Sequence, residues 1–315
     1  MSEYDDNISK PQIAKELFRR WSDARKQWDA EARDAVDFTL GNHYTAEEST
    51  ALQSVGQADF VIDRVYAAVD KLKSLLTARP ARFSAIARED SDHKIANVWR
   101  TILEYIWDIS NGDTTFKQVV HDYAVTGLGY MYVYVDPEAD YGRGEVKYTH
   151  IDPFRVYVDP ASRDRFFHDA SGILLSTFLT RQQVLDLYPQ LNEMIDDIEV
   201  GSNSLYGEDY PSSNLKNSQN VLTPAEAKNL DYNVTQKYQI LDRFYKIKVP
   251  YYRLFNSVDG TEKIIDSNVY NTIIQEGDTI EAIERGAIQV EEIMQTRIAQ
   301  CSTIGNILLY ERVLN

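Results

Sequence analysis

The 315-residue chain contains one cysteine, Cys301, and far fewer basic than acidic side chains. A lone thiol cannot form an internal disulfide, and no nearby cysteine or histidine gives it zinc-ligand spacing. The 33 lysines and arginines stand against 49 aspartates and glutamates, so the net charge is −16. Tight binding to a nucleic-acid backbone needs clustered basic side chains. The excess of acidic side chains therefore disfavours this function. The acidity fits two interpretations: a surface past which DNA slides, or a surface that is simply soluble.

Long hydrophobic runs are also missing. The longest, such as residues 129–135, fall far short of the roughly 20 apolar residues that cross a bilayer. The N-terminal sequence MSEYDDNISK lacks the basic start and the apolar stretch of a signal peptide. We therefore expect no membrane span, and a chain that stays in the cytoplasm where it is made.

Motifs for nucleotide binding and nucleophilic catalysis are absent. The sequence contains no G-x-x-x-x-G-K-[ST], and the G-x-G of residues 127–129 precedes a predicted strand instead of following it. We interpret it as a hinge between a helix and a strand, where a permissive backbone is needed. No G-x-S-x-G marks a serine nucleophile. Cys301 is expected to be a small residue in a half-buried strand.

A group of aspartates offers the sharpest catalytic alternative, a metal-dependent nuclease or hydrolase that binds Mg²⁺ and activates water. Its members are Asp136, Asp140, Asp152, Asp159, Asp164 and Asp169. Three of them belong to Asp-Pro pairs at different strand ends, where aspartate typically bonds to the local backbone. No histidine or lysine completes a metal-nuclease pattern with them. We therefore predict no catalytic, cofactor-binding or metal-binding residue, and no enzyme.

The five histidines are scattered over the predicted elements. His43 and His168 fall in loops, His93 and His121 on helices, and His150 in a strand. No H-x-x-x-H or H-E-x-x-H occurs among them, so a zinc-dependent catalytic site has no sequence support.

Aromatic residues are abundant, with 21 tyrosines and four tryptophans. Tyr130, Tyr132 and Tyr134 alternate in one predicted strand. Tyr245 and the pair 251–252 lie near Lys246 and Lys248. Aromatic side chains flanked by basic ones can stack single-stranded bases. Packing in the core or at a subunit interface is the favoured interpretation, because tyrosine packs well in sheets and protein contacts.

Helical periodicity predicts four helices in the first 130 residues. They span residues 9–40, 59–78, about 90–110, and a segment that ends at Gly127. Ser9 and Gln12 have the spacing of a capping box for the first helix. Pro80 stops the second, and Asp113 is expected to cap the fourth.

A change to period two predicts strands over residues 130–135, 145–151, 154–158 and 172–179. A helix follows, with Thr180 and Gln183 as its capping box. Residues 201–220 are rich in serine, asparagine and glycine, which indicates a loop or linker.

The remaining sequence is predicted to be mostly strand. A long strand over residues 236–256 leads through a turn at 258–260 into further strands and a short helix. The further strands are expected at 262–265 and 269–274, the helix at 279–285, and a closing hairpin at 291–300 and 307–314 around residues 302–306. This is an α+β pattern without βαβ alternation or an internal repeat.

Three segments, taken in order, resemble the portal proteins of tailed bacteriophages, most of all those of short-tailed phages. The first is the opening helix that runs into DFTLGNHY. The second joins the helix and proline segment DFVIDRVYAAVDKLKSLLTARPARFSAIARED to the helix, Gly-x-Gly and strand of SNGDTTFKQVVHDYAVTGLGYMYVYVD. The third is the strand pair with Asp-Pro turns, THIDPFRVYVDPASRDRFFHDA.

The resemblance implies a portal-like α+β fold. It has a wing-like domain at residues 1–200, a linker at 201–220 and a β-rich, clip-like domain at 221–315. Family members continue into a return stem helix and a crown region, whereas this chain ends at ERVLN. Either the chain is a fragment or those parts are missing.

The resemblance also implies a function: a non-enzymatic subunit of a homo-oligomeric ring, usually a dodecamer, at one vertex of the virion capsid. Double-stranded DNA would pass through its channel during packaging and ejection, without sequence-specific binding. The expected partners are the major capsid protein, the terminase, and the head-to-tail adaptor and tail proteins, with assembly in the host cytoplasm and no cofactor. A head-to-tail adaptor protein is the structural alternative.

Overall fold

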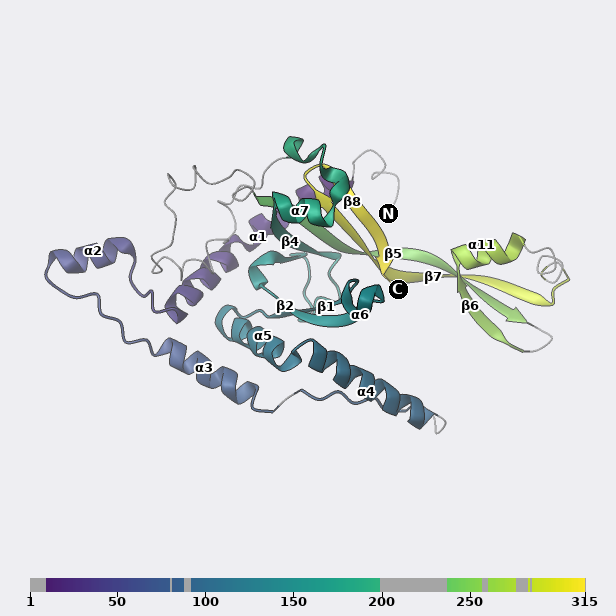
Figure 1. The fold of residues 1–315 in the computed structure, drawn as a ribbon, viewed down its shortest axis with the longest axis horizontal. Helices are drawn as coiled ribbons and strands as arrows, with labels where there is room; N and C mark the ends of the chain where they lie inside the picture. The colour runs from purple at the N-terminus through teal and green to yellow at the C-terminus, as the bar shows by residue number, and fades with distance from the viewer. Residues whose placement is uncertain are drawn as a thin grey trace. The chain divides into compact units, whose positions relative to one another are not determined.

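The computed structural model describes residues 10–79, 81–87, 92–198, 237–256, 260–275, 283 and 285–314. Among these, the chain divides into two compact units (Figure 1). The helical unit contains residues 19–157, and the sheet unit contains 10–18, 158–198 and the described residues from Tyr238 onward. Helices and strands are both abundant, which confirms the α+β class. No helix in the described ranges is both long and apolar enough to cross a membrane.

The helix α1 (Lys10–Thr39) matches the predicted opening helix closely. Of the apolar side chains at three- and four-residue spacing that predict this helix, Trp21 is buried, whereas Ala24 and Phe38 are exposed. The predicted capping box begins at Ser9, which lies outside the described residues. The spacing therefore identified the helix but only part of its buried face, which also contains Ala14 and Ala32.

The helix predicted over residues 59–78 is present, but its predicted first residue was wrong. The helix α3 (Val65–Leu76) starts six residues later, because the carboxylate of Asp63 accepts a hydrogen bond from the backbone amide of Tyr66 at 2.9 Å. Ahead of it lies α2 (Ala46–Ser54), which the apolar periodicity did not predict. Thr45 and Glu48 cap α2 reciprocally, a signal that was present in the sequence.

The helices α4 (His93–Ile109) and α5 (Gly112–Thr126) follow each other almost directly. The prediction that Asp113 caps α5 was wrong. Asp113 lies within the first turn, and its carboxylate accepts a hydrogen bond from the indole of Trp107 at 3.0 Å. Asn111 makes the link between the helices in the left-handed conformation, with φ 49°.

Two antiparallel strands complete the helical unit, β1 (Tyr130–Asp136) and β2 (Glu145–Ile151). Their register runs from Tyr130 opposite Ile151 to Asp136 opposite Glu145, and the short helix α6 (Ala139–Gly142) lies in the connection. Both strands agree with the prediction. Helices α4 and α5 pack on β2, where the ring of Trp107 lies 5.8 Å from that of Tyr148.

A six-stranded sheet dominates the rest of the chain. Its order is β3-β4-β5-β7-β8, with β6 paired to β5 outside this path. The strands are β3 (Val156–Val158), β4 (Gly172–Thr180), β5 (Lys237–Asn256), β6 (Glu262–Asp266), β7 (Ile288–Ile304) and β8 (Ile307–Leu314). The short 3-10 helix η2 (Pro153–Arg155) precedes β3. The strand predicted at 154–158 is therefore present, but it begins at Val156, two residues later than predicted.

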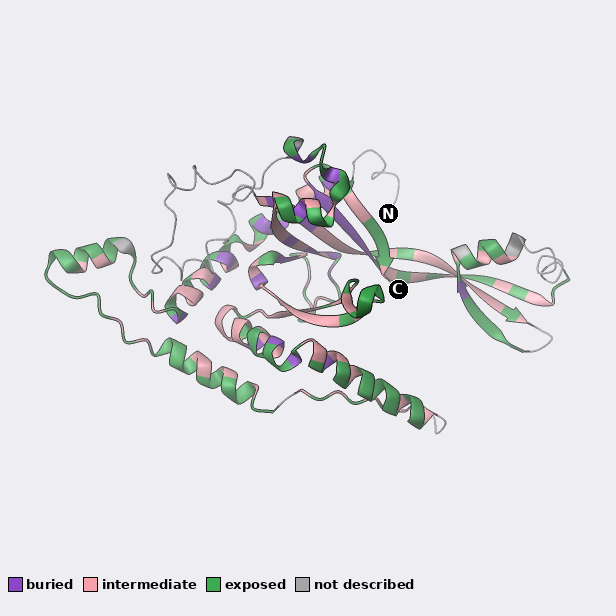
Figure 2. Ribbon diagram, viewed as in Figure 1, coloured by how far each residue is buried: buried purple, intermediate pink, exposed green. Residues whose placement is uncertain are grey.

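The core of the sheet unit lies beneath the helix α7 (Arg181–Leu187) and the 3-10 helices η3 (Pro189–Leu191) and η4 (Ile195–Asp197). The capping box of Thr180 and Gln183 is present as predicted. Figure 2 shows the buried positions concentrated here. The core residues are Val184, Leu191, Ile195, Ile198, Tyr238, Ile240 and Ile304.

Strands β5 and β7 continue beyond this core as a paired ribbon. Their register holds from Ile240 opposite Ile304 to Asn256 opposite Ile288. Near the far end, β6 pairs with β5 from Tyr251 to Phe255, which confirms the predicted hairpin. In Figure 1 the outer ribbon, β6 and the helix α11 (Ser267–Gln275) project away from the rest of the sheet.

The strand predicted at residues 269–274 was wrong, because this segment belongs to α11. The carboxylate of Asp266 accepts a hydrogen bond from the amide of Val269 at 2.7 Å, which starts a helical turn. The ring of Tyr270 then stacks on Tyr252 of β5 with centroids 3.8 Å apart. A short apolar run cannot be assigned by periodicity alone, and here the acidic cap decided the outcome.

Four other predictions concern residues 201–314. The closing hairpin is present, but its turn is narrower than expected, since β7 extends to Ile304 and β8 begins at Ile307. The turn at 258–260, the helix at 279–285 and the linker at 201–220 lie wholly or largely outside the described residues. The proposed domain limits near residues 200 and 221 fall in the same gap, so the division into domains stays a prediction.

Candidate functional site

Each of the three Asp-Pro turns uses its carboxylate locally. Asp136, Asp152 and Asp159 accept hydrogen bonds from the backbone amides two residues further on, at 3.1, 2.9 and 2.9 Å. Asp136 also pairs with Lys147 at 2.7 Å. The second oxygen of Asp159 accepts hydrogen bonds from the amide and the hydroxyl of Ser171. These carboxylates fix the strand ends, as the sequence predicted.

The remaining aspartates of the group are also engaged. Asp169 accepts from the hydroxyl of Ser162 and from the amide of Arg163, and these hydrogen bonds lower its pKa to about 2. The imidazole of His168 lies 2.6 Å from Asp164 and lowers the pKa of that carboxyl. In the part of the chain that the structure describes, no three acidic, histidine or cysteine side chains could hold a metal ion together. The arrangement gives the nuclease alternative no support.

The histidines are not brought together. His43 stacks on Phe38 with ring centroids 4.9 Å apart, and His93 is the first residue of α4. Nδ1 of His121 on α5 is buried, with no hydrogen-bond partner among the described atoms. No pair of histidines therefore shares a site in the described ranges.

His150, like His168, has a carboxylate partner, but it is more buried than His168. Its Nε2 lies in hydrogen-bonding contact with the carboxylate of Asp122, so that β2 is tied to α5. This hydrogen bond raises the pKa of His150. Burial raises the pKa of the neighbouring Asp152. The three groups form a partly buried acid–base cluster.

The Gly-x-Gly segment has the structural role that the sequence predicted. Gly127 ends α5 with φ 80°, in the left-handed region that favours glycine. A Cβ atom at position 129 would lie 2.5 Å from the carbonyl oxygen of Val119. The segment lets the chain turn from α5 into β1 at close range, and it is not a phosphate-binding loop.

The tyrosines engage one another and basic side chains. Tyr132 and Tyr134 stack on one face of β1 with centroids 6.0 Å apart, and burial raises the pKa of Tyr130. The guanidinium of Arg297 lies 5.0 Å from the ring of Tyr251. The hydroxyl of Tyr245 donates to Glu311 at 2.6 Å. These contacts agree with packing rather than with a platform for bases.

A polar cluster within the helical unit was not predicted. The guanidinium of Arg25 on α1 donates to the backbone carbonyls of Pro153, Phe154 and Val156. It also pairs with Asp29 at 2.8 Å and lies 3.9 Å from the ring centre of Tyr157. The signal in the sequence was an arginine and an aspartate four residues apart beside the apolar stripe of α1.

The sheet unit holds a second polar cluster. Asp242, Ser302 and Tyr310 lie opposite one another across β5, β7 and β8. The amide of Gln300 donates to the hydroxyl of Tyr310 at 2.8 Å. Burial raises the pKa of Asp242 and that of the neighbouring Cys301. Cys301 is a buried residue of β7, which agrees with the prediction that it is a small residue packed in a strand.

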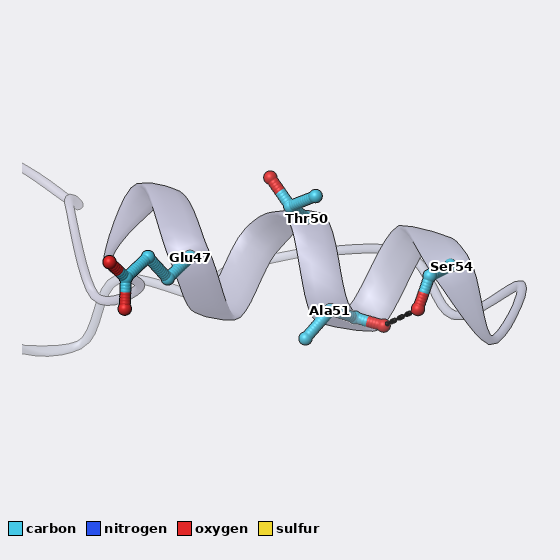
Figure 3. Close-up of a pocket in the computed structure, with 4 residues that line it drawn as sticks. All are labelled: Glu47, Thr50, Ala51 and Ser54. Carbon is cyan, nitrogen blue, oxygen red and sulfur yellow. Dashed lines mark hydrogen bonds between the residues drawn. The ribbon is translucent and has the colours of Figure 1, made fainter.

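Two hollows lie on the surface of the described residues. One is bounded by four residues of the single helix α2, and Figure 3 shows them spread along one side of it, with the Ser54 hydroxyl donating to the Ala51 carbonyl. The other is a pocket of about 230 Å³ in the sheet unit, whose lining includes the aromatic residues Phe166, Phe244 and Tyr245 and the basic Lys246. Neither holds a catalytic constellation.

The most conspicuous surfaces are two apolar stripes on helices of the helical unit. The α3 stripe consists of Val65, Leu72, Leu75 and Leu76, and the α4 stripe of Ile95, Val98, Trp99 and Ile102. All eight side chains are exposed, Leu75 to 67% and Trp99 to 56%. Figure 2 shows both helices predominantly in the colour of exposed residues. Such stripes are candidates for contact with another protein chain.

Comparison with known proteins gives one clear result. No curated protein matches the chain. A family model described as phage P22-like portal protein matches residues 15–313, which is nearly the whole chain and includes both compact units. The match agrees with the order of segments on which the resemblance was based. The chain therefore belongs to the family of phage P22-like portal proteins.

Proposed function

We propose that the protein is a structural subunit of the portal ring at one vertex of a phage capsid, through which double-stranded DNA is packaged and ejected. The family match over residues 15–313 carries the proposal. The family implies assembly into an oligomeric ring in a phage capsid, and its members are structural proteins. A dodecamer is the expected ring, because the portal proteins that this chain resembles usually form rings of twelve subunits.

The charge of the chain supports a passive channel. With 49 acidic and 33 basic side chains, the protein repels a polyanion more than it holds one. The sequence has no P-loop, so the energy for DNA movement has to come from a separate terminase motor. In this proposal the ring is a docking platform for the terminase, and afterwards for the head-to-tail adaptor and tail proteins, while the major capsid protein surrounds it.

The proposed domains are a wing-like part at residues 1–200 and a clip-like part at 221–315. The outer end of the β5–β7 ribbon, together with β6 and α11, projects away from the rest of the sheet (Figure 1). This projection lies within the proposed clip-like part and supports that assignment. We propose that this end reaches the partners that dock outside the capsid.

The test is direct imaging of the purified full chain. Light scattering and negative-stain microscopy over a range of concentrations should reveal closed rings with a central opening. A strict monomer at every concentration would contradict the proposal. In virions, antibody labelling should place the protein at a single capsid vertex. Labelling on the tail side of a different portal ring would instead identify a head-to-tail adaptor.

A further inference from the structure

We propose that the α3 stripe of one copy packs against the α4 stripe of the next copy around the ring. The inference rests on the proposed ring and adds the surfaces that close it. The partner is a second copy of this chain, and the contact is between two different faces of the same unit.

The exposure of the two stripes is the first argument. Eight large apolar side chains are at least 38% exposed on two neighbouring helices of one unit. A half-exposed leucine or aromatic side chain presents roughly 100 Å², so each stripe offers several hundred Å². A standard interface takes about 800 Å² from each partner, of which one stripe would form the apolar centre.

The second argument is geometric. Rings with more than two subunits are closed by heterologous contacts, in which two different surfaces of the same chain meet. The two stripes differ in sequence, but both repeat at three and four residues along one helical face. The α3 stripe runs from Val65 to Leu76 and is about 17 Å long, and the α4 stripe runs from Ile95 to Ile102 and is about 11 Å long. The shorter stripe can pack side by side with part of the longer one.

Charge favours a second copy over DNA as the partner. Residues 64–82 contain five basic side chains and one carboxylate, although the whole chain carries −16. That carboxylate, Asp70, pairs with Lys73 at 2.7 Å. On the proposed neighbour, α4 presents exposed carboxylates at Glu104 and Asp108 beyond its stripe, and the basic side chains of Lys94 and Arg100 beside the stripe. Only the C-terminal part of α4 can therefore face the basic residues of α3 favourably, and exposed leucines suit a protein surface rather than a DNA backbone.

Cysteine cross-linking between copies tests the contact. Leu72 or Leu75 is changed to cysteine together with Val98 or Trp99, which gives four double variants of the full chain. Mild oxidation should convert at least one of them into a ladder of covalent oligomers on a non-reducing gel, extending to the number of subunits in the ring. Pairing Leu75→Cys with Tyr141→Cys is the matched control, because Tyr141 is fully exposed and belongs to neither stripe.

A ladder limited to dimers would indicate a symmetric contact and overturn the proposal. So would a disulfide within a single chain, or the absence of cross-links in all four variants when the wild-type protein forms rings. If the wild-type protein forms no rings, the proposed function itself fails, which is a separate outcome.

A charge placed in each stripe provides a second measurement. Leu75→Asp and Trp99→Asp should each raise the concentration needed for ring assembly by at least about tenfold, as expected for central apolar contacts. Leu187→Asp on α7, a similarly exposed leucine, should have little effect. Circular dichroism verifies that the variants fold. Intact assembly in both stripe variants would overturn the proposal. A Lys71→Glu variant that loses DNA binding but assembles normally would also overturn it, because DNA would then be the partner of this surface.

Discussion

The guanidinium of Arg25 lies 2.8 Å from the carboxylate of Asp29, one helical turn further along α1, and the same guanidinium donates to three carbonyls around the Asp-Pro turn at residues 152–153. Both side chains are largely buried. This pair joins α1 to the segment that leads into β3. Motifs for catalysis or metal binding do not reveal such a contact.

Loss of Arg25 should destabilise the protein substantially. Arg25→Ala leaves Asp29 as an unpaired buried charge and three carbonyls without a donor, so we expect the free energy of unfolding to fall by about 3 kcal/mol. Urea denaturation followed by tryptophan fluorescence measures the change. Arg20→Ala, on the same helix but more exposed, is the control. Equal stability of both variants would contradict a structural role for the Arg25 cluster.

The His150–Asp122 contact should make stability depend on pH. Because the pKa of His150 is raised in the folded protein, its contribution is fully present below its ordinary value of 6.5 and is lost as the pH rises through the folded value. Unfolding free energies should therefore fall as the pH rises from 6.5 through the raised pKa of His150 in the folded protein, and His150→Gln should flatten this slope.

Two facing groups and one control define the experiment on His150. Asp122 lies on α5 and Asp152 follows β2; the pKa of Asp152 is raised from 3.8, so its own titration affects stability at lower pH. His43→Gln removes a partly exposed histidine that lies outside this cluster and should leave the slope in place. An unchanged slope in His150→Gln would show that another group is responsible.

The two glycines between α5 and β1 should respond differently to alanine. Gly129→Ala places a methyl group 2.5 Å from the Val119 carbonyl oxygen, so we expect a loss of about 1–3 kcal/mol as the strand is displaced. Gly127→Ala meets no atom within 4 Å and should lose only about 1 kcal/mol, through its positive φ. Thermal denaturation of the two variants compares the costs, and the reverse order would contradict the close approach.

The Asp-Pro turns should matter for stability and not for metal binding. Asp159→Ala removes acceptors for Ala161 and Ser171, and a cost of about 1–2 kcal/mol is expected, with a smaller loss in Asp159→Asn. Addition of Mg²⁺ should leave the melting temperature unchanged. A Mg²⁺-dependent nuclease activity that disappears in the Asp152→Ala, Asp159→Ala double variant would instead revive the enzymatic alternative.

Local rules of sequence explain most of the fold. Alternating aromatic and β-branched residues predicted β1 and β2, and the Asp-Pro pairs predicted how three strands end. The errors occurred where a single polar side chain overrides an apolar pattern. Asp63 delays the start of α3, and Asp266 turns an apparent strand into α11. In each case the pattern was compatible with two structures, and the cap selected one.

The candidate surfaces were less accessible to prediction than the elements that carry them. The periodicity of α3 and α4 predicted an apolar face on each, but periodicity alone does not distinguish a face buried in the chain from one that stays exposed. The Arg25 cluster was missed for a similar reason, since it joins residues more than 120 positions apart. Contacts of that kind depend on tertiary structure.

The ribbon of β5 and β7 has a mechanical consequence. Seventeen consecutive residue pairs join the two strands, from Ile240 with Ile304 to Asn256 with Ile288, and the register is unbroken along this length. Pro250 of β5 has no N–H to donate, yet it keeps its place opposite Met294. Because the register does not shift, a displacement of the outer end would be carried along both strands to the core around Ile240 and Ile304.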